Sequence, residues 1–238
     1  MTGRLYVLGI GPGDPELMTL KSVRILGQVP TVFVPKGREE GSSLALSIAQ
    51  KAADLSGKEI IEAYFPMKKT RASEAGDELD LQWQDTVKAV MERLGRGIDV
   101  AFITLGDPTI YSTFFYLHNR LLELDPAISI ELVPGVSSIT ASAARSGTYL
   151  GIADDRVAIL PANYTGDLHD VLMQFETVVL MKVSKVFSNI VSTLKTANLL
   201  DRAVYVARAG MEDEKIVHDL REVREEDLNY FSIVIIRK

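Results

Sequence analysis

Three glycine-containing turns combine the residue types and spacing in this sequence that are best suited to chemistry. They are Gly9-Ile10-Gly11-Pro12-Gly13-Asp14-Pro15, Leu105-Gly106-Asp107-Pro108-Thr109 and Val133-Pro134-Gly135-Val136-Ser137-Ser138. Each turn follows an apolar stretch typical of a strand and precedes a stretch typical of a helix. Glycine lets the backbone approach a ligand closely, and open α/β sheets bind ligands at the carboxyl ends of their strands. We therefore expect the three turns to contribute to one ligand site.

The two Gly-Asp-Pro tripeptides also have a simpler interpretation as helix starts. Asp is a good N-cap and Pro a good first helical residue, so Asp14 and Asp107 are expected to begin helices at residues 15 and 109. Phosphate recognition is disfavoured, because the first turn is G-x-G-x-G and Pro12 has no N–H to offer a phosphate. The next strand ends at Lys36, where an NAD site needs an acidic residue.

The elements that must position these turns are predicted from apolar periodicity. Strands are expected at 4–10, 31–34, 59–63, 99–105, 129–133, 157–160, 177–181, 203–209, 215–219 and 232–237, and helices at 15–26, 43–54, 81–94, 109–123, 137–145, 167–174 and 184–197. Alternating strands and helices predict a mostly parallel N-terminal sheet, and the denser strands after about residue 200 predict a mixed C-terminal sheet. Pro126 marks the break, so two α/β domains are expected over 1–124 and 125–238.

Composition excludes several classes of site. The 238 residues include no cysteine, which removes disulfides, thiol nucleophiles and cysteine-bound zinc. The net charge of −6 argues against nucleic-acid and membrane-surface partners. His118, His169 and His218 have no metal-ligand spacing, so no protein-bound metal is expected. With no signal-peptide pattern and no run of 18 apolar residues, we expect a cytoplasmic protein.

Five stretches in the same order along the chain resemble the tetrapyrrole methylase family, the class III S-adenosylmethionine-dependent methyltransferases. They are VLGIGPGDPELMTLKSVRIL (7–26), TLGDPTIYST (104–113), LVPGVSSITA (132–141), VVLMK (178–182) and VYVARAG (204–210). PELMTLKSVRIL, Val34-Pro35-Lys36-Gly37 and Tyr64-Phe65-Pro66-Met67 most resemble the branch that methylates carbon 20 of precorrin-2 or cobalt-precorrin-2. Leu105 and Ser137 depart from the Gly and Thr usual in uroporphyrinogen methyltransferases.

The resemblance implies a homodimer of two-domain subunits with S-adenosylmethionine in the cleft between the domains and S-adenosylhomocysteine as product. Carried over by position, the cofactor-binding residues are Pro12, Gly106, Asp107, Ile110, Ser137, Ser138, Met181, Ala207 and Phe231. Methyl transfer by in-line displacement needs orientation more than an activated side chain. The catalytic base is therefore left unassigned, with Asp107, Tyr64 and Tyr111 as candidates.

The implied substrate is a tetrapyrrole bearing eight carboxylates, so basic residues are expected to gather at its site in this acidic chain. The candidates are Lys36, Arg38, Lys68 and Lys69, with Arg71 in the same polar segment; a solvated loop is the alternative. Cobalt-precorrin-2 (cobalt-factor II) is the favoured substrate and metal-free precorrin-2 the alternative. Methylation of RNA or of a modified histidine, a nucleotide-binding oxidoreductase and a non-catalytic binding module are less favoured.

Overall fold

The computed structural model describes residues 2–37, 43–64, 76–164 and 166–238, and these form two compact units, Met1–Ser137 and Ser138–Lys238. The expected pair of α/β domains is confirmed, but the division differs from the one expected after residue 124. Strand β5 (Ile130–Val133) pairs with β1 (Leu5–Gly9) and completes the first sheet. Pro126 therefore lies in a loop within the first unit, between α4 (Phe114–Leu124) and β5.

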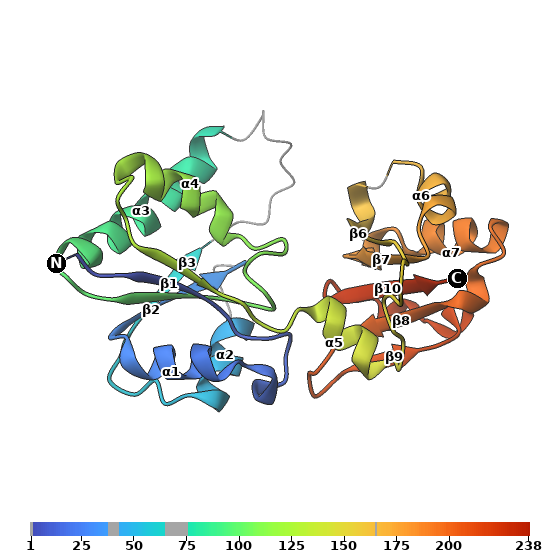
Figure 1. The fold of residues 1–238 in the computed structure, drawn as a ribbon, viewed down its shortest axis with the longest axis horizontal. Helices are drawn as coiled ribbons and strands as arrows, with labels where there is room; N and C mark the ends of the chain where they lie inside the picture. Colours follow the sequence, from blue (N-terminus) through green and yellow to red (C-terminus); the bar gives the residue numbers. More distant parts are fainter. Residues whose placement is uncertain (1, 38–42, 65–75, 165) are drawn as a thin grey trace. The chain divides into compact units, whose positions relative to one another are not determined.

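The first unit is built on a five-stranded parallel sheet with strand order β3-β2-β4-β1-β5 (Figure 1). The remaining strands are β2 (Thr31–Lys36), β3 (Glu59–Tyr64) and β4 (Val100–Thr104). β4 is buried at every residue, as expected for a central strand covered on both faces. Because all strands run the same way, the turns after β1, β4 and β5 emerge at one edge of the sheet.

Two helices cover each face of this sheet. On one face lie α1 (Leu20–Gln28) and α2 (Leu44–Ala52), and on the other α3 (Gly76–Gly95) and α4 (Phe114–Leu124) (Figure 1). Alternate residues of the strands supply the two apolar cores, since successive side chains of a strand point to opposite faces. In β1, for example, Leu8 belongs to the α1/α2 core and Val7 to the α3/α4 core.

Two expected helices in the first unit begin later than predicted. The stretch 15–26 divides into a short 3₁₀ turn, Pro15–Leu17, and α1, because extended Thr19 caps α1 by accepting a hydrogen bond from Ser22 N–H. The helix expected from residue 109 starts only at Phe114. Tyr111 has a φ of 53°, which is outside the right-handed helical region and prevents a continuous helix through it.

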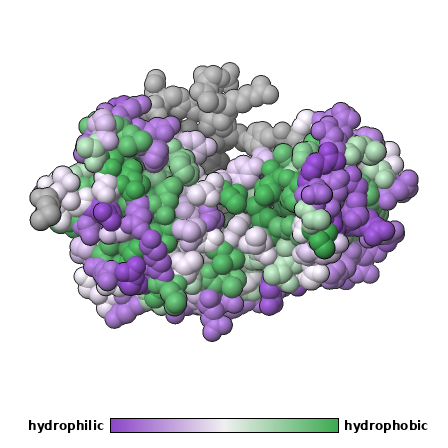
Figure 2. Space-filling view, in the orientation of Figure 1, coloured by the Kyte–Doolittle hydropathy of each residue, from purple (hydrophilic) through white to green (hydrophobic). Residues whose placement is uncertain are grey.

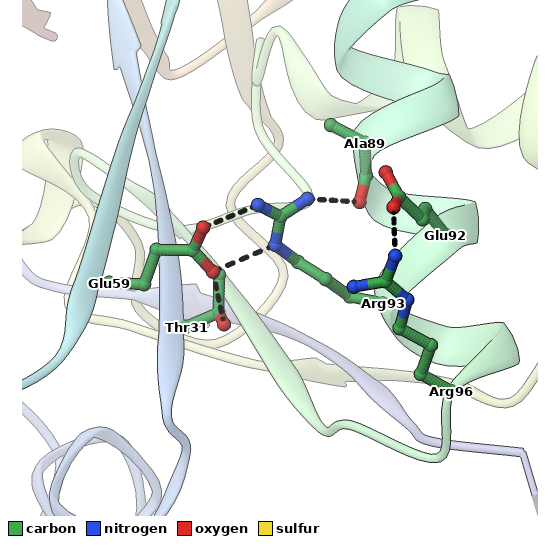
Figure 3. Close-up of polar contacts among 6 residues, drawn as sticks. All are labelled: Thr31, Glu59, Ala89, Glu92, Arg93 and Arg96. Atoms are coloured by element: carbon green, nitrogen blue, oxygen red, sulfur yellow. Dashed lines mark hydrogen bonds and ion pairs between the residues drawn. The ribbon is translucent and has the colours of Figure 1, made fainter.

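A partly exposed ion pair joins α3 to the sheet. Arg93 on α3 donates through Nε and Nη2 to both carboxylate oxygens of Glu59 on β3, at 2.8 and 2.5 Å (Figure 3). Thr31 Oγ1 donates to the same carboxylate at 3.0 Å. Hydrogen bonding from Arg93 lowers the pKa of Glu59 to about 2. Burial acts in the opposite direction, and the hydrogen bond from Thr31 lowers the pKa further.

The second unit is built on a mixed sheet with strand order β6-β7-β10-β8-β9. The strands are β6 (Val157–Pro161), β7 (Thr177–Met181), β8 (Ala203–Ala207), β9 (Lys215–Val217) and β10 (Ser232–Arg237). Only the β6–β7 pairing is parallel among these, as expected for a mixed C-terminal sheet.

Helices flank the second sheet as well. Its helices are α5 (Ser138–Arg145), α6 (Leu168–Gln174) and α7 (Phe187–Thr196), joined by short 3₁₀ turns at Ala162–Tyr164, Val183–Lys185, Leu200–Arg202, Leu220–Glu222 and Glu225–Asp227. α6 and α7 pack on one face, where Leu180, Tyr205 and Val234 form the centre of a core. Strand β8 ends at Ala207, two residues before the expected end at 209, because Arg208 has a φ of 54°.

The surface of both units mixes hydrophilic and hydrophobic residues (Figure 2). Among the helices in the described part of the chain, none has the length and apolar character needed to cross a membrane.

Candidate functional site

The first two glycine turns bond directly to each other. Gly106 N–H donates to Gly11 O at 2.7 Å, and Gly11 N–H donates to Gly106 O at 3.3 Å, forming an isolated antiparallel bridge. Both residues have positive φ, 79° for Gly11 and 73° for Gly106, a conformation that L side chains disfavour. The two turns that the sequence predicted to act together are therefore joined directly by main-chain hydrogen bonds.

The third turn packs against the other two at a distance that only glycine allows. A Cβ at Gly135 would lie 2.3 Å from the carbonyl oxygen of Gly106, and a Cβ at Gly9 would lie 2.6 Å from Gly135 N. These separations are shorter than any ordinary van der Waals contact. The turns at the carboxyl ends of β1, β4 and β5 thus pack backbone against backbone, which holds all three close together at one edge of the sheet.

Asp107 holds the second and third turns together. Its Oδ1 accepts hydrogen bonds from the N–H of Thr109 at 2.7 Å and from the Thr109 hydroxyl, and its Oδ2 accepts from Gly135 N–H at 3.0 Å. Burial acts to raise the pKa of Asp107, but these hydrogen bonds outweigh burial and hold the pKa below its usual range. A carboxylate so occupied is a poor proton acceptor, so this geometry makes Asp107 a positioning residue.

Ser22 anchors the first turn from helix α1, and sequence reasoning missed it. Its side chain is fully buried, accepts from the Thr19 hydroxyl at 3.0 Å and donates to Gly9 O at 3.0 Å. The available signal was a serine at helical spacing from Ile25 and Leu26, on the face that packs into the core.

The remaining predicted residues of the first unit lie around these turns. Pro12 is buried, Ile110 is partly buried, and Tyr111 is about half exposed in its left-handed conformation. Burial raises the pKa of the Tyr111 hydroxyl, so Tyr111 stays protonated at neutral pH and cannot take a further proton. Ser137 is buried at the end of the first unit.

Three of the four predicted residues of the second unit lie close together at strand ends of its sheet. Ser138 begins α5. Met181 ends β7 and Ala207 ends β8, and both strands run antiparallel to β10, whose first residue follows Phe231. Met181 pairs with Ile233 and Ala207 with Ser232, so Met181, Ala207 and Phe231 lie at neighbouring positions. Phe231 is 39% exposed and contacts the ring of Tyr230 edge-on.

A second anchoring group, also missed from the sequence, fixes the loop that follows β8. Glu214 accepts Gly210 N–H at 2.7 Å and binds Arg145 of α5, whose Nε lies 2.8 Å from Oε1. Burial opposes ionisation of Glu214, but the hydrogen bonds from Arg145 and Gly210 keep its pKa low. A Glu and an Arg 69 residues apart give no signal that could have paired them in the sequence.

The structure places one of the predicted basic residues and leaves the others outside the part that it describes. Lys36 Nζ donates to Glu62 Oε2 at 2.8 Å, and its side chain is only 11% exposed. Tyr64, a candidate base, ends β3 opposite Lys36 in the β2–β3 register. Arg38, Lys68, Lys69 and Arg71 lie outside the described residues. Their role as substrate-binding residues stays a prediction.

Metal-ligating side chains do not cluster in residues 2–37, 43–64, 76–164 and 166–238. No group of three or more His, Cys, Asp or Glu side chains in these ranges is arranged to hold a metal ion.

Comparison with known families decides what kind of protein carries these turns. The family model of the Tetrapyrrole (Corrin/Porphyrin) Methylases matches residues 4–223, which include all three turns and the edge residues Met181 and Ala207. The chain belongs to the tetrapyrrole methylases. Phe231 lies beyond the matched range.

Two curated relatives match this tetrapyrrole methylase over its whole length. The cobalt-precorrin-2 C(20)-methyltransferase of Salmonella typhimurium is 35% identical over 242 residues, covering 100% of this chain and 98% of the relative. The probable cobalt-precorrin-2 C(20)-methyltransferase of Methanocaldococcus jannaschii is 36% identical, covering 99% and 96%. A crystal structure of uroporphyrin-III C-methyl transferase from Thermus thermophilus complexed with S-adenyl homocysteine has the same fold, with a TM-score of 0.65, 23% identity and coverage of 99% and 98%.

Proposed function

We propose that this tetrapyrrole methylase transfers a methyl group from S-adenosylmethionine to carbon 20 of cobalt-precorrin-2 in cobalamin biosynthesis. The observation that carries this proposal is the match along the whole chain to two relatives named for that reaction, at 35% and 36% identity. Because the match covers both units, it includes the glycine turns of the first and the strand ends of the second. Metal-free precorrin-2 is the alternative substrate.

The residues present fit S-adenosylmethionine. Glycine at 9 and 135 lets the three turns pack backbone against backbone, so main-chain polar groups of three strand ends lie together at one edge of the sheet. Main-chain N–H and C=O groups at strand ends can bind its carboxylate and ammonium, and its bound form supplies a methyl carbon on a positively charged sulfur. We assign Pro12, Gly106, Ile110 and Ser137 to this ligand in the first unit, and Ser138, Met181, Ala207 and Phe231 in the second.

The chain's own contribution to the reaction is orientation. Asp107 fixes the second turn against the third, and Ser22 fixes the first turn against α1. Rigid placement of two reactants lowers the barrier by prepaying the entropy of bringing them together. Of the three candidate bases, Asp107 is occupied by hydrogen bonds, and the hydroxyls of Tyr64 and Tyr111 are as tyrosines already protonated at neutral pH, so the group that accepts the proton displaced from carbon 20 is left unassigned.

A direct assay tests the proposed function. The protein is incubated with S-adenosylmethionine and sirohydrochlorin, with and without cobalt inserted, and the visible spectrum and product mass are recorded. We expect a mass gain of one methyl group and faster turnover of the cobalt form. Faster turnover of the metal-free form would favour the alternative substrate. No methyl gain with either form would refute the proposal, and NAD(P) titrated into the same sample tests the oxidoreductase interpretation.

We also propose that the protein works as a homodimer, as its family resemblance implies. Light scattering of the purified protein is expected to give about twice the 26.2 kDa of one chain. A mass of one chain at micromolar concentration would contradict this.

A further inference from the structure

Two basic residues of the second unit have a backbone conformation that normally requires glycine. Lys182, directly after β7, has φ 60° and ψ 42°, and Arg208, directly after β8, has a φ of 54°. In the described part of the chain only three other non-glycine residues have positive φ: Tyr111, Ala153 and Asn198. Glycine would adopt this conformation without the clash that an L residue suffers between Cβ and the following carbonyl oxygen.

Consecutive residues at the start of β10 hold both backbones in place, Phe231 just before the strand and Ser232 as its first residue. Lys182 N–H donates to Ser232 O at 3.1 Å, and Arg208 N–H donates to Phe231 O at 2.8 Å. Both strands that end at these residues pair with β10, so the backbones of Lys182 and Arg208 flank its first residues. Adjacent strands lie about 4.8 Å apart, which puts the two backbones roughly 10 Å from each other.

The two side chains differ in their burial and in the contacts that they make. The Lys182 side chain is partly buried, and burial lowers the pKa of its amine. The Arg208 side chain is 27% exposed and uses Nε to bind the exposed carboxylate of Asp213. A guanidinium has five N–H donors, so this contact leaves donors on Arg208 that can bind a second acceptor. Strained residues persist mainly where a ligand site benefits from them.

We propose that Lys182 and Arg208 bind carboxylate groups of the tetrapyrrole and thereby help to select a polycarboxylate substrate. The inference rests on the proposed function, because that function supplies a ligand with several carboxylates. Both cations adjoin Met181, Ala207 and Phe231, so they lie beside the residues of the second sheet that we assign to S-adenosylmethionine.

Glycine variants separate the side chain from the backbone. Lys182→Gly and Arg208→Gly keep the left-handed turn and remove the cation, while Lys182→Arg keeps a cation. Asn198→Gly is the matched control, because Asn198 has a φ of 56° beyond the end of α7.

Each glycine variant is expected to keep or raise Tm. Lys182→Gly and Arg208→Gly are expected to raise KM for the tetrapyrrole about tenfold, a typical effect of losing a charged hydrogen bond. Lys182→Arg and Asn198→Gly are expected to stay within about twofold of wild type.

Two binding measurements identify the source of the carboxylate. Uroporphyrin, with eight carboxylates, serves as a probe by its absorption, and S-adenosylhomocysteine is titrated by calorimetry. We expect weaker uroporphyrin binding and unchanged S-adenosylhomocysteine binding in both cation variants. Unchanged uroporphyrin binding and unchanged KM would overturn the proposal. A selective loss of S-adenosylhomocysteine binding would also overturn it, by assigning the cations to the methyl donor.

The same measurements distinguish failure of this inference from failure of the proposed function. If the wild-type protein binds uroporphyrin through Lys182 and Arg208 but methylates neither form of sirohydrochlorin, the carboxylate site stands and the proposed reaction fails. If methylation proceeds with wild-type KM in both cation variants, the reaction stands and the carboxylate site fails.

Discussion

Replacing Asp107 with Asn tests whether this residue holds the site together or only caps a local turn. The carboxylate accepts two hydrogen bonds from Thr109 and one from Gly135 N–H, 28 residues further along the chain. An asparagine keeps one acceptor oxygen and turns an NH₂ group toward one of these donors. The loss of a charge-assisted hydrogen bond costs about 1.5–3 kcal/mol, and partial exposure of Asp107 favours the lower part of that range. We expect the first unit to lose about 2 kcal/mol of unfolding free energy.

Asp125 supplies a matched control within the same unit. Asp125-Pro126-Ala127 repeats the local contact of Asp107-Pro108-Thr109, with Ala127 N–H donating to Asp125 Oδ1 at 2.9 Å. No contact to a distant turn is among the hydrogen bonds described for Asp125. Asn replaces Asp well in such a local cap, so Asp125→Asn is expected to cost less than about 0.5 kcal/mol.

The single tryptophan makes the measurement specific to the first unit. Trp83 lies in α3, so its fluorescence during urea unfolding reports on that unit. With a slope of about 2 kcal/mol per molar urea, a loss of about 2 kcal/mol moves the midpoint by about 1 M. The affinity for S-adenosylhomocysteine, measured by calorimetry, is expected to fall in Asp107→Asn and to stay unchanged in Asp125→Asn.

The pH dependence gives a second criterion for Asp107. Its folded pKa lies below its ordinary value, so its stabilising effect is complete above the unfolded pKa of about 4 and is lost as pH falls through the folded pKa. The difference in stability between wild type and Asp107→Asn should therefore shrink in acid. Equal midpoint shifts for Asp107→Asn and Asp125→Asn, or a difference that stays constant down to pH 2, would refute the reasoning.

Two further predictions concern the packing and the electrostatics of the first unit, and Trp83 fluorescence measures both. Gly135→Ala is expected to destabilise the first unit by about 3 kcal/mol, because the new Cβ would meet Gly106 O at 2.3 Å. The control Gly27→Ala on α1 places a Cβ with nothing within 4 Å and should stabilise the unit by about 0.5–1 kcal/mol. Equal effects of the two substitutions would contradict the close packing of the turns. Glu59→Gln is expected to cost at most about 1 kcal/mol at pH 7, since its ion pair with Arg93 is half exposed. Hydrogen bonding from Arg93 lowers the Glu59 pKa to about 2, so this cost should disappear as pH falls from about 4 to 2, and a cost that persists at pH 2 would show that the charge is unimportant.

The strands were the part of the fold most fully encoded in local sequence. Runs such as Val100–Thr104 and Thr177–Met181 are apolar because both of their faces are covered, and that pattern is visible without coordinates. Helix starts were less predictable. The strain at Tyr111 that delays α4 gives no local signal, since nothing in its residue type requires positive φ.

The roles of the basic residues in the candidate site were also difficult to predict from the sequence. Lys36 was expected to bind substrate because the implied polycarboxylate needs basic residues at its site. The sequence could not reveal that Glu62 on the neighbouring strand lies 2.8 Å from the Lys36 amine. Lys182 and Arg208 were not predicted to bind substrate. Their left-handed backbones become evident only in the structure, where β7 and β8 both pair with β10.

The three Asp-Pro dipeptides at 14, 107 and 125 mark the boundary between what the sequence determines and what folding adds. Each Asp bonds to the N–H two residues later, because that contact depends only on local backbone geometry and side-chain length. Asp107 also binds Gly135, and this contact depends on β4 and β5 lying on either side of β1 in a parallel sheet. Sequence alone therefore determined the turns, the family resemblance and the methyl-transfer expectation. The tertiary structure alone decided that Asp107 joins two turns, because the order of strands in a sheet is set by long-range packing.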